Sequence, residues 1–426
     1  MTLENINGKT KYKNSSAKNQ EYYQINFFML SDRDIIIIGI QPWDIEIGSN
    51  CKNLAQEFAK NNRVLYVNAP LDRITLLKKN NVKTKKRIRV NKGLEPDLVK
   101  LKDGLWNLYP KGVIESINWI KNNWIYDFLN KRNNRIFANA INSAIQRLGF
   151  KDFILFNDNA MFTGFYIKEL LRPKVSVYYM RDFLTVEPYW KRHGLRIEPE
   201  LIKKSDLVVT NSLFYKKYAL QFNPNSFMVG QGCDTTIFND SDNLINAAQD
   251  LSSIQKPIIG YIGTLVSRRL DITLIANIAK QRPQWSIVLV GPEDEDFANS
   301  ELHSIPNIYF LGFREMSLLP NYIKGFDVCI NPQLVNETTI GNYPRKIDEY
   351  LLMGKPTVAT ATDAMEYFKD YAYLAKNHQD YVALIEKALN ENSAEKKLQR
   401  RMFANSHTWE NNAKEIYNSI EKVIHS

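Results

Sequence analysis

Short apolar runs that alternate with helical patterns recur along this chain. The first run is Asp34–Ile40 (DIIIIGI), and a helical pattern over about Cys51–Lys60 and a second run at Arg63–Asn68 follow it. Such runs are typical of buried strands, and their alternation with helices indicates parallel βαβ units rather than a β-sandwich. The sequence therefore predicts an α/β fold that begins with a doubly wound parallel sheet.

The length of the chain indicates two lobes. With 426 residues the chain is too long for one ordinary core. Further strands are predicted at Asp152–Phe156, Val175–Tyr179, Leu207–Thr210 and Ser226–Val229, which complete a first lobe over 27–238 after a mobile polar tail over 1–26. A polar stretch without strand pattern follows, so we predict a linker over 239–256 and a second lobe over 257–404.

The segment Asn342–Ala359 (NYPRKIDEYLLMGKPTVA) predicts a helix, a tight turn and a buried strand. Pro344 suits the first turn of a helix, and Gly354 can end it. Lys346 and Glu349 are three residues apart and share one helix face. A carboxylate near a strand end can accept hydrogen bonds from the two hydroxyls of a ribose, and the neighbouring ammonium can face phosphate oxygens. The segment therefore points to a nucleotide-sugar site.

Five motifs resemble, in order, the donor-binding domain of the group 1 glycosyltransferases, a retaining family with the GT-B fold that includes bacterial polysaccharide-assembly enzymes. They are GYIGTL at 260–265, IVLVGP at 287–292, IYFLG at 308–312, DVCINP at 327–332 and P-x-K-x-x-E-Y-L-x-x-G-K-P at 344–356. The resemblance implies two Rossmann-like lobes that face a central cleft, with the acceptor on the N-terminal side. It also implies that 405–426 is a helix that returns to the first lobe.

The resemblance implies a role for several residues of the second lobe. In such enzymes the glutamate that matches Glu349 holds the donor ribose, and basic residues after the first glycine-rich turn neutralise the diphosphate. The donor-binding residues expected here are Gly263, Thr264, Arg268, Arg269, Gly291, Pro344, Lys346 and Glu349. The arginines precede a predicted helix, LDITLIANIAK, whose N-terminus could face the same pyrophosphate. The chain departs from the family at Gly341, where the first of two glutamates is usual.

The acceptor side is predicted from strand ends of the first lobe. Arg181 and Asp182 follow a strand and resemble the family's acidic segment at the cleft, and Asp182 is expected to contact the acceptor hydroxyl or act as a base. In a front-face retaining mechanism the leaving phosphate can take the proton, so Asp182 can instead orient the acceptor. Asp182 and Glu349 are thus the catalytic candidates. His193, in a charged loop, is the alternative polar group, although a lone histidine there is most often a surface residue.

The loop after the first strand also borders the expected cleft. It contributes Trp43, Asp44, Gly48 and Ser49. Gly48 and Ser49 precede a helix and could hold an anion there, or could simply form a turn and a helix cap. The loop lacks G-x-G-x-x-G, so a dinucleotide cofactor has little support.

Fixed cations, rather than a metal, are expected to neutralise the diphosphate. No Asp-x-Asp pair stands in a convincing setting for a metal site, and the acidic cluster at 293–296 is interpreted as a solvated loop. No cofactor besides the donor substrate is expected. Three widely separated cysteines favour a reducing compartment, and no run reaches the roughly 18 apolar residues that a membrane-spanning helix needs. The predicted location is the cytoplasm, with no secretory signal in the polar tail.

Positive charge is concentrated in the first half of the chain. Residues 1–240 hold 37 Lys and Arg against 23 Asp and Glu, a net charge of +14. A run of basic residues over 78–92 precedes a segment that interleaves basic residues with Trp119, Trp124 and Phe128. This pattern fits an anionic membrane surface, although a solvated loop and partly buried tryptophans fit it as well. Nucleic acid is not expected, because no known nucleic-acid-binding motif is present.

The sequence thus predicts a glycosyltransferase that is retaining and independent of metal. It would move a sugar from a nucleotide diphosphate to a glycan or a lipid-linked acceptor, in cell-surface polysaccharide synthesis at the inner face of the membrane. Two alternatives remain open. One is a nucleotide-sugar 2-epimerase of the same fold, which needs no acceptor. The other is a nucleotide-sugar-binding scaffold without turnover, which the departure at Gly341 suggests.

Overall fold

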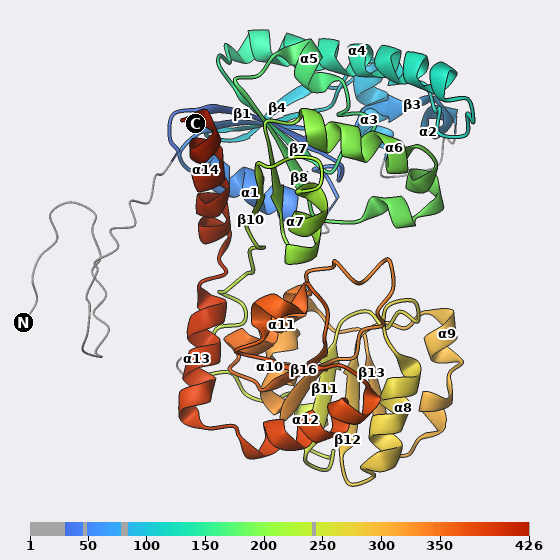
Figure 1. The fold of residues 1–426 in the computed structure, drawn as a ribbon, viewed down its shortest axis with the longest axis vertical. Helices are drawn as coiled ribbons and strands as arrows, with labels where there is room; N and C mark the ends of the chain where they lie inside the picture. The colour runs from blue at the N-terminus through green and yellow to red at the C-terminus, as the bar shows by residue number, and fades with distance from the viewer. Residues whose placement is uncertain (1–29, 46–48, 78–83, 241–243, 426) are drawn as a thin grey trace, which may run out of the picture.

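A computed structural model describes residues 30–45, 49–77, 84–240 and 244–425. The predicted tail over 1–26 and Gly48 lie outside these residues. The chain forms two α/β lobes, one above the other in Figure 1, and the predicted GT-B fold is confirmed. Among the described residues, no helix has the combined length and apolar character that crossing a bilayer requires.

The N-terminal lobe is built on an eight-stranded sheet with the order β10-β9-β8-β7-β1-β2-β5-β4. Its strands are β1 (Asp34–Gly39), β2 (Arg63–Val67), β4 (Leu98–Lys102), β5 (Leu105–Leu108), β7 (Ile154–Asp158), β8 (Val175–Met180), β9 (Leu207–Thr210) and β10 (Ser226–Met228). Its helices include α1 (Asn50–Phe58), α4 (Asn123–Leu148), α5 (Ile167–Leu171), α6 (Pro188–Lys204) and α7 (Leu213–Ala219).

Strand β1 shows why these runs form buried strands. Ile35 and Ile37 pack on one face in a core shared with α1, whereas Ile36 and Ile38 pack on the other face in a core shared with α4. Side chains alternate between the faces of a strand, so an unbroken apolar run is stable only where both faces are covered.

One edge of this sheet differs from the parallel arrangement that the sequence predicts. Strand β4 pairs with β5 in the antiparallel direction. The two strands are joined by Asp103 and Gly104, and Gly104 has a φ of +73°. A two-residue Asp-Gly turn favours a hairpin, which places neighbouring strands antiparallel. Nearby, β3 (Leu71–Asp72) and β6 (Val113–Ile114) form a small separate pair, flanked by α2 (Arg73–Leu77) and α3 (Lys85–Asn91).

The C-terminal lobe has a six-stranded parallel sheet with the order β13-β12-β11-β14-β15-β16. The strands are β11 (Ile258–Ile262), β12 (Ser286–Val290), β13 (Ile308–Gly312), β14 (Val328–Asn331), β15 (Thr357–Thr360) and β16 (Tyr373–Ala375). The helices are α8 (Ile272–Gln281), α9 (Glu295–Ala298), α10 (Leu319–Gly325), α11 (Arg345–Leu352), α12 (His378–Asn390) and α13 (Ala394–Asn405). The strand order reverses between β11 and β14, where ligands of such sheets bind.

The crossing between the lobes differs from the predicted linker. Cys233 and Phe238 are already buried in the core of the C-terminal lobe, and so are Leu251 and Ile254. The described part of 239–256 is therefore packed on the second lobe. Its few apolar residues lie far apart in the sequence, and only the folded lobe shows that they share one core.

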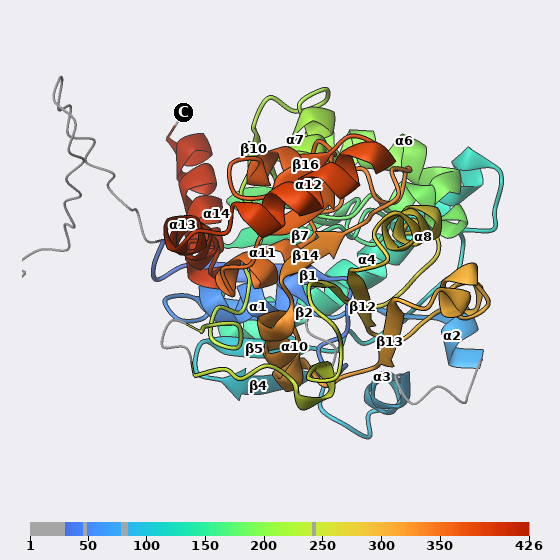
Figure 2. The same cartoon turned by 90° about the horizontal axis from the view of Figure 1, so that it is seen from below.

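The last helix, α14 (Trp409–Ile424), packs on the N-terminal lobe. Ile416 and Ile420 are buried in the core beside α1, and the Asn412 amide donates to the Val229 carbonyl at 2.8 Å. Figures 1 and 2 both show α13 and α14 following one another along one side of the molecule. The chain therefore crosses twice between the lobes.

Candidate active site

Helix α11 places Glu349 at the cleft side of the C-terminal lobe. The helix begins after Pro344, which makes no side-chain capping bond, and Gly354 follows its end with a φ of +71°. The Tyr350 hydroxyl accepts a hydrogen bond from the Ile262 backbone N–H at 2.9 Å, which fastens α11 to the end of β11. The first turn of α11 therefore has no side-chain cap and lies next to the strand end where a ligand is expected.

Glu349 is a buried carboxylate whose negative charge has few partners among the described residues. The residue is 7% exposed, and its nearest cation among the described residues is the Arg345 guanidinium, at 3.8 Å. No hydrogen bond from another described residue reaches the carboxylate. Burial raises the pKa of Glu349, although the charges of Arg345 and Lys346 oppose the shift. Because an unpaired buried carboxylate is costly, this group is suited to a ligand that supplies hydroxyl donors.

Two glycines bring the backbone close together beside α11. Gly263 ends β11 with a φ of +128°, and Gly291 ends β12 with a φ of +152°. A Cβ on Gly291 would lie 2.0 Å from the Gly263 carbonyl oxygen, so this turn tolerates no side chain. The Lys346 ammonium donates to the Tyr261 hydroxyl and would lie 3.2 Å from a Cβ on Gly263. Thr264 is exposed next to this cation, so the predicted glycine-rich turn and Lys346 do come together.

The two arginines of the following loop face the N-terminal lobe. The Arg268 guanidinium pairs with the Glu187 carboxylate at 3.0 Å across the cleft. Arg269 is exposed, and its charge is close enough to Asp182 to lower the pKa of that carboxyl. The predicted anion site at the N-terminus of α8 is wrong. The Asp271 carboxylate caps that helix by accepting from the Leu274 N–H at 2.8 Å, so a carboxylate already occupies the N-terminus.

On the opposite side of the cleft, polar residues cluster at the ends of β7 and β8. The Arg181 guanidinium contacts the buried Asp158 carboxylate at 2.7 and 3.2 Å, and it also contacts Asp182. The Asn159 amide, in a residue with a φ of +55°, donates to the Asp182 carbonyl at 3.0 Å. Desolvation raises the pKa of Asp182, against the charges of Arg181 and Arg269. Arg181 is thus a positioning group, and Asp182 remains partly open to the cleft.

The residues predicted after β1 are only partly available to a ligand. Trp43 packs edge-on against Tyr66 with ring centroids 4.9 Å apart, and Asp44 is exposed. The Ser49 hydroxyl caps α1 by accepting from the Lys52 N–H at 3.2 Å, and Ser49 is buried. Ser49 therefore serves the helix cap rather than an open anion site, and Gly48 is not among the described residues.

His193 does not lie in a surface loop, so the prediction is wrong for this residue. It lies within α6 and is 1% exposed. One ring nitrogen, Nε2, is 2.9 Å from the Ile120 carbonyl, and the ring stacks on Tyr126 at 3.6 Å. Its contacts join α6 to the segment before α4. The periodicity of α6 is interrupted by Pro199, which hides the helix from sequence reasoning.

The interpretation of the acidic cluster at 293–296 as a solvated loop agrees with Glu295 and Asp296, which are exposed, but not with Asp294. The Asp294 carboxylate caps α9 by accepting from the Phe297 N–H at 2.9 Å. It also accepts from the Ser267 N–H at 2.8 Å. Asp294 therefore holds the loop after β11, which carries Arg268 and Arg269, against the loop after β12.

Gly341 lies where the two lobes touch. Its carbonyl accepts a hydrogen bond from the Ser212 hydroxyl at 2.7 Å. A Cβ at this position would lie 2.5 Å from Phe214 and 2.6 Å from Tyr215, both in α7 of the other lobe. The space in which the usual glutamate would begin is therefore filled by two aromatic rings. Sequence alone shows the departure but not its cause.

Sequence reasoning missed two features of the cleft. The first is the Asp158 and Asn159 pair, which the polar FNDN stretch at the end of an apolar run could have indicated. The second is Glu187, which reaches Arg268 across the cleft. No local pattern signals that contact, because its partner is 81 residues away in the sequence.

Comparisons with known proteins agree with this fold. Residues 256–391 match the family model for group 1 glycosyl transferases. TuaH of Bacillus subtilis, named as a glycosyltransferase of teichuronic acid biosynthesis, is 31% identical over 174 residues. That alignment covers 39% of this chain and 44% of TuaH, so the chain matches less than half the length of this relative.

Solved structures of similar fold cover nearly all of the chain. Sucrose-phosphate synthase from Thermosynechococcus elongatus has a TM-score of 0.64 at 15% identity, and the alignment covers 92% of this chain and 99% of that one. Anabaena HepE in complex with UDP has a TM-score of 0.62 at 16% identity, with coverage of 92% and 100%. Identities this low establish the fold alone. The chain has the GT-B fold, and its C-terminal lobe matches the family model of the group 1 glycosyl transferases.

Proposed function

We propose that this protein is a glycosyltransferase that moves a sugar from a nucleotide diphosphate to an acceptor in the synthesis of a cell-surface polysaccharide. The observation that carries the proposal is Glu349, a buried carboxylate without a hydrogen bond from any described residue, beside the first turn of α11, which has no side-chain cap. The ribose hydroxyls of a nucleotide would donate to this carboxylate. The match of 256–391 to the family and the UDP and UDP-glucose complexes of HepE support a nucleotide-sugar donor.

The diphosphate would lie between the glycine turn and α11. Lys346 stands over the Gly263 turn, and Arg269 faces the cleft from the loop that follows. These fixed cations, together with the N–H groups of the first turn of α11, would stabilise the charge of the leaving diphosphate without a metal. Asp182 would orient the acceptor hydroxyl. In a retaining, front-face reaction the leaving phosphate would take the proton of that hydroxyl.

The acceptor would bind in the N-terminal lobe, as a glycan or a lipid-linked saccharide. The exposed tryptophans and basic residues of that lobe support contact with an anionic membrane surface on the cytoplasmic side. The protein would then be peripheral to the membrane.

Calorimetric titration with UDP, GDP, dTDP and ADP tests the donor site. We expect one diphosphate to bind equally well with Mg²⁺ and with EDTA. Glu349→Gln should weaken that binding about ten- to hundredfold, because a charge-assisted hydrogen bond is worth roughly 1.5–3 kcal/mol. Glu337→Gln is the matched control, since Glu337 is exposed. Unchanged affinity in folded Glu349→Gln would refute the assignment, and a turnover product without acceptor would favour the epimerase.

A further inference from the structure

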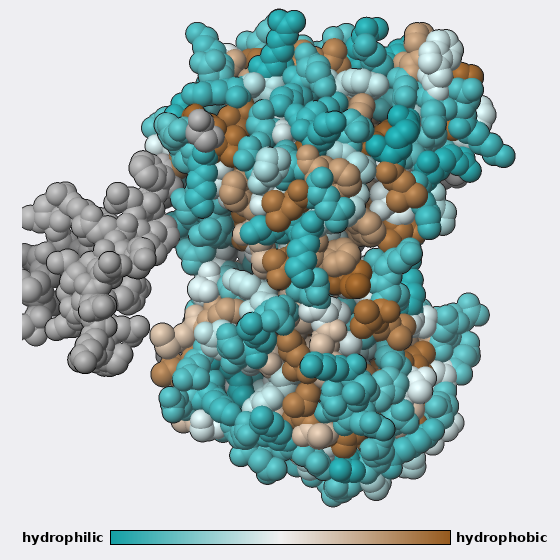
Figure 3. Space-filling model, viewed as in Figure 1, coloured by the Kyte–Doolittle hydropathy of each residue, from teal (hydrophilic) through white to brown (hydrophobic). Residues whose placement is uncertain are grey.

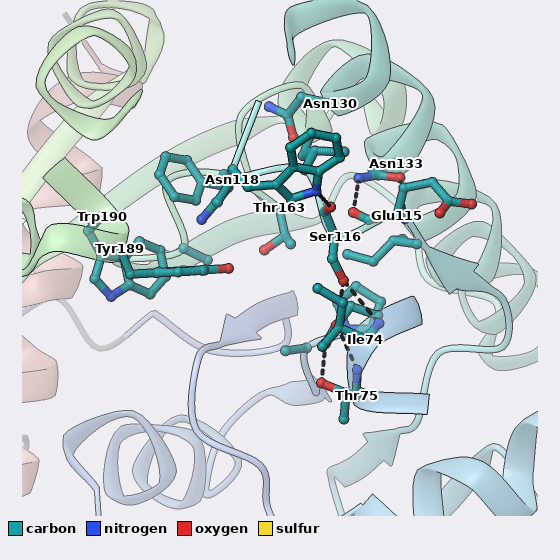
Figure 4. A pocket seen from close by; sticks show the side chains of 18 of the residues that line it. Ile74, Thr75, Glu115, Ser116, Asn118, Asn130, Asn133, Thr163, Tyr189 and Trp190 are labelled. Carbon is teal, nitrogen blue, oxygen red and sulfur yellow. Dashed lines mark hydrogen bonds between the residues drawn. The ribbon is translucent and has the colours of Figure 1, made fainter. Parts of the chain in front are cut away.

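The N-terminal lobe contains a cavity of about 680 Å³ beside the cleft. Its walls come from the β3–α2 segment, the chain between β6 and α4, the first half of α4 and the start of α6 (Figure 4). Gly39, at the end of β1, and Pro188 line the cleft side, and Pro188 directly follows Glu187, which contacts Arg268 of the other lobe. One wall of the cavity therefore adjoins the residue that bridges the two lobes.

The polar groups of the cavity are mostly bonded to one another. The Asp72 carboxylate accepts from the Thr75 N–H at 3.0 Å and from the Ser116 hydroxyl at 2.7 Å. The Asn133 side chain forms two bonds of 2.9 Å with the backbone of Glu115. Groups satisfied in this way have little to offer a ligand. The surface left to a ligand is mainly apolar.

Aromatic and aliphatic side chains form that apolar surface. They include Ile74, Ile117, Trp119, Phe162, Tyr189 and Trp190. The rings of Phe162 and Trp190 stack with centroids 5.1 Å apart. A cavity of this size and character suits the apolar part of a ligand better than a saccharide, which needs a polar partner for nearly every hydroxyl.

Three buried polar atoms in the wall nevertheless lack partners among the described residues. They are the amide nitrogens of Asn118 and Asn130 and the hydroxyl of Tyr126. Asn130 and Tyr126 are 3% and 0% exposed. A buried polar group without a partner is costly, so these atoms point to a ligand that carries a few oxygens. Arg192 also lines the cavity and adds a cation. A ligand with an apolar chain and an anionic oxygen group would match both the apolar surface and these polar groups.

The mouth of the cavity opens onto an exposed apolar surface. Ile74, Trp119 and Tyr189 at the mouth are 45%, 68% and 62% exposed. Trp124 and Phe128, on the outer face of α4, are exposed beside them and stack at 6.3 Å. A chain longer than the cavity could continue across this rim.

We propose that the cavity binds the apolar chain of a lipid-linked acceptor. In such an acceptor a phosphate joins the chain to the sugar, and this phosphate would lie next to the bound chain. This inference rests on the proposed function, since it names the acceptor of the same reaction. The chain lies against Ile74, Trp119 and Phe162, and the Tyr126 hydroxyl and the Asn130 amide donate to phosphate or linking oxygens. The sugar then extends past Pro188 towards Asp182.

Farnesyl phosphate, kept below its micelle concentration, is the probe, with glycerol 3-phosphate as the head group without a chain. We expect micromolar binding of the first by calorimetry and none of the second. Trp119→Ala should weaken binding about tenfold, because the indole covers one wall. Trp124→Ala is the matched control and should change it less than twofold, because Trp124 is equally exposed but does not line the cavity.

Tyr126→Phe gives a second, independent test. It removes an unpartnered buried hydroxyl, so a purely structural role predicts unchanged or higher thermal stability and unchanged binding. We expect stability to hold and farnesyl phosphate affinity to fall at least fivefold. Equal binding in Trp119→Ala and wild type, or tight binding of glycerol 3-phosphate, would overturn the proposal.

Titration with UDP on the same samples separates this inference from the proposed function. If the protein binds UDP but does not bind farnesyl phosphate, the cavity assignment is refuted and the donor-site assignment stands. If farnesyl phosphate binds and this binding depends on Trp119, but no nucleotide binds, the cavity assignment is supported and the proposed function is refuted.

Discussion

Among the other buried carboxylates, that of Glu198 lies away from the cleft. Glu198 in α6 is 0% exposed, and it accepts a hydrogen bond from the Tyr178 hydroxyl at 2.8 Å. Burial raises the pKa of Glu198 to about 7, although the Tyr178 bond lowers it. The folded protein therefore holds a proton on this residue at pH values where the unfolded chain releases it.

This shift predicts a pH-dependent stability. The contribution of a group with a raised folded pKa is complete below its unfolded value of 4.5 and is lost as pH rises through about 7. Relative to Glu198→Gln, the wild type should lose about 3 kcal/mol of unfolding free energy over that range. Denaturant unfolding at pH 4.5, 6 and 7.5 measures it. Glu200→Gln, an exposed neighbour on the same helix, is the control. If the unfolding free energies of Glu198→Gln and of the wild type change with pH in the same way, the raised pKa of Glu198 is contradicted.

At the scale of elements, the contact between α7 and the loop before α11 determines how the lobes meet. Ser212 and Gly341 join the two elements, and Lys217 of α7 pairs with Asp363 at 2.7 Å. The contact is tight because Gly341 lacks a Cβ. The loop that reaches α7 leads directly into the helix that carries Glu349, so closure of the lobes and the shape of the donor site are coupled in this arrangement.

Gly341→Ala should therefore separate the lobes or strain their contact. The new methyl group would overlap Phe214 and Tyr215, and overpacking of this kind typically costs about 1–3 kcal/mol. We expect a larger radius of gyration in X-ray scattering and a lower melting temperature. The double variant Gly341→Ala with Phe214→Ala should recover part of the loss. If neither radius nor melting temperature changes, the lobes are not in this contact in solution.

At the scale of the whole molecule, charge and exposed aromatic side chains gather on one lobe. The sequence did not decide whether Trp119 and Trp124 are buried or exposed. In the structure both are exposed, Trp119 at 68% and Trp124 at 78%. Lys121, Lys131 and Arg132 are exposed around them. In Figure 1, α2 and α4 both belong to the upper lobe, and Figure 3 shows hydrophilic and hydrophobic residues next to each other on that lobe. In contrast, Lys86 of the basic run contacts the Tyr109 ring at 4.5 Å within the lobe.

Binding to anionic vesicles should depend on this surface. Each basic residue near an anionic leaflet contributes about 1 kcal/mol, so replacing Lys121, Lys131 and Arg132 by serine should weaken vesicle binding about a hundredfold. Sedimentation with phosphatidylserine vesicles measures it, and high salt should have a similar effect. Leu398→Ser with Met402→Ser, exposed on α13 of the other lobe, is the control. Vesicle binding that survives the triple change would place the membrane contact elsewhere.

Local patterns allowed much of the fold to be predicted. The apolar runs of β1, β8, β9 and β11 were found because strands buried on both faces need unbroken apolar sequence. Helix α11 was found from its proline, its glycine and its periodicity. The edge hairpin of β4 and β5 was missed although its Asp-Gly turn favours a hairpin, because the residues of β4 are only partly apolar and mostly exposed.

The sequence by itself determined which residues could build a nucleotide-sugar site. Lys346 and Glu349 share a helix face by their spacing, and the resemblance to the family implied the two glycine turns. Only the tertiary structure decided what their neighbours are. It buried His193, used Ser49 and Asp271 as helix caps, and set Arg268 against Glu187 across the cleft. It also assembled the cavity from segments that lie far apart in the sequence. Contacts between residues far apart in the chain depend on how the two lobes pack, and no local pattern encodes that packing.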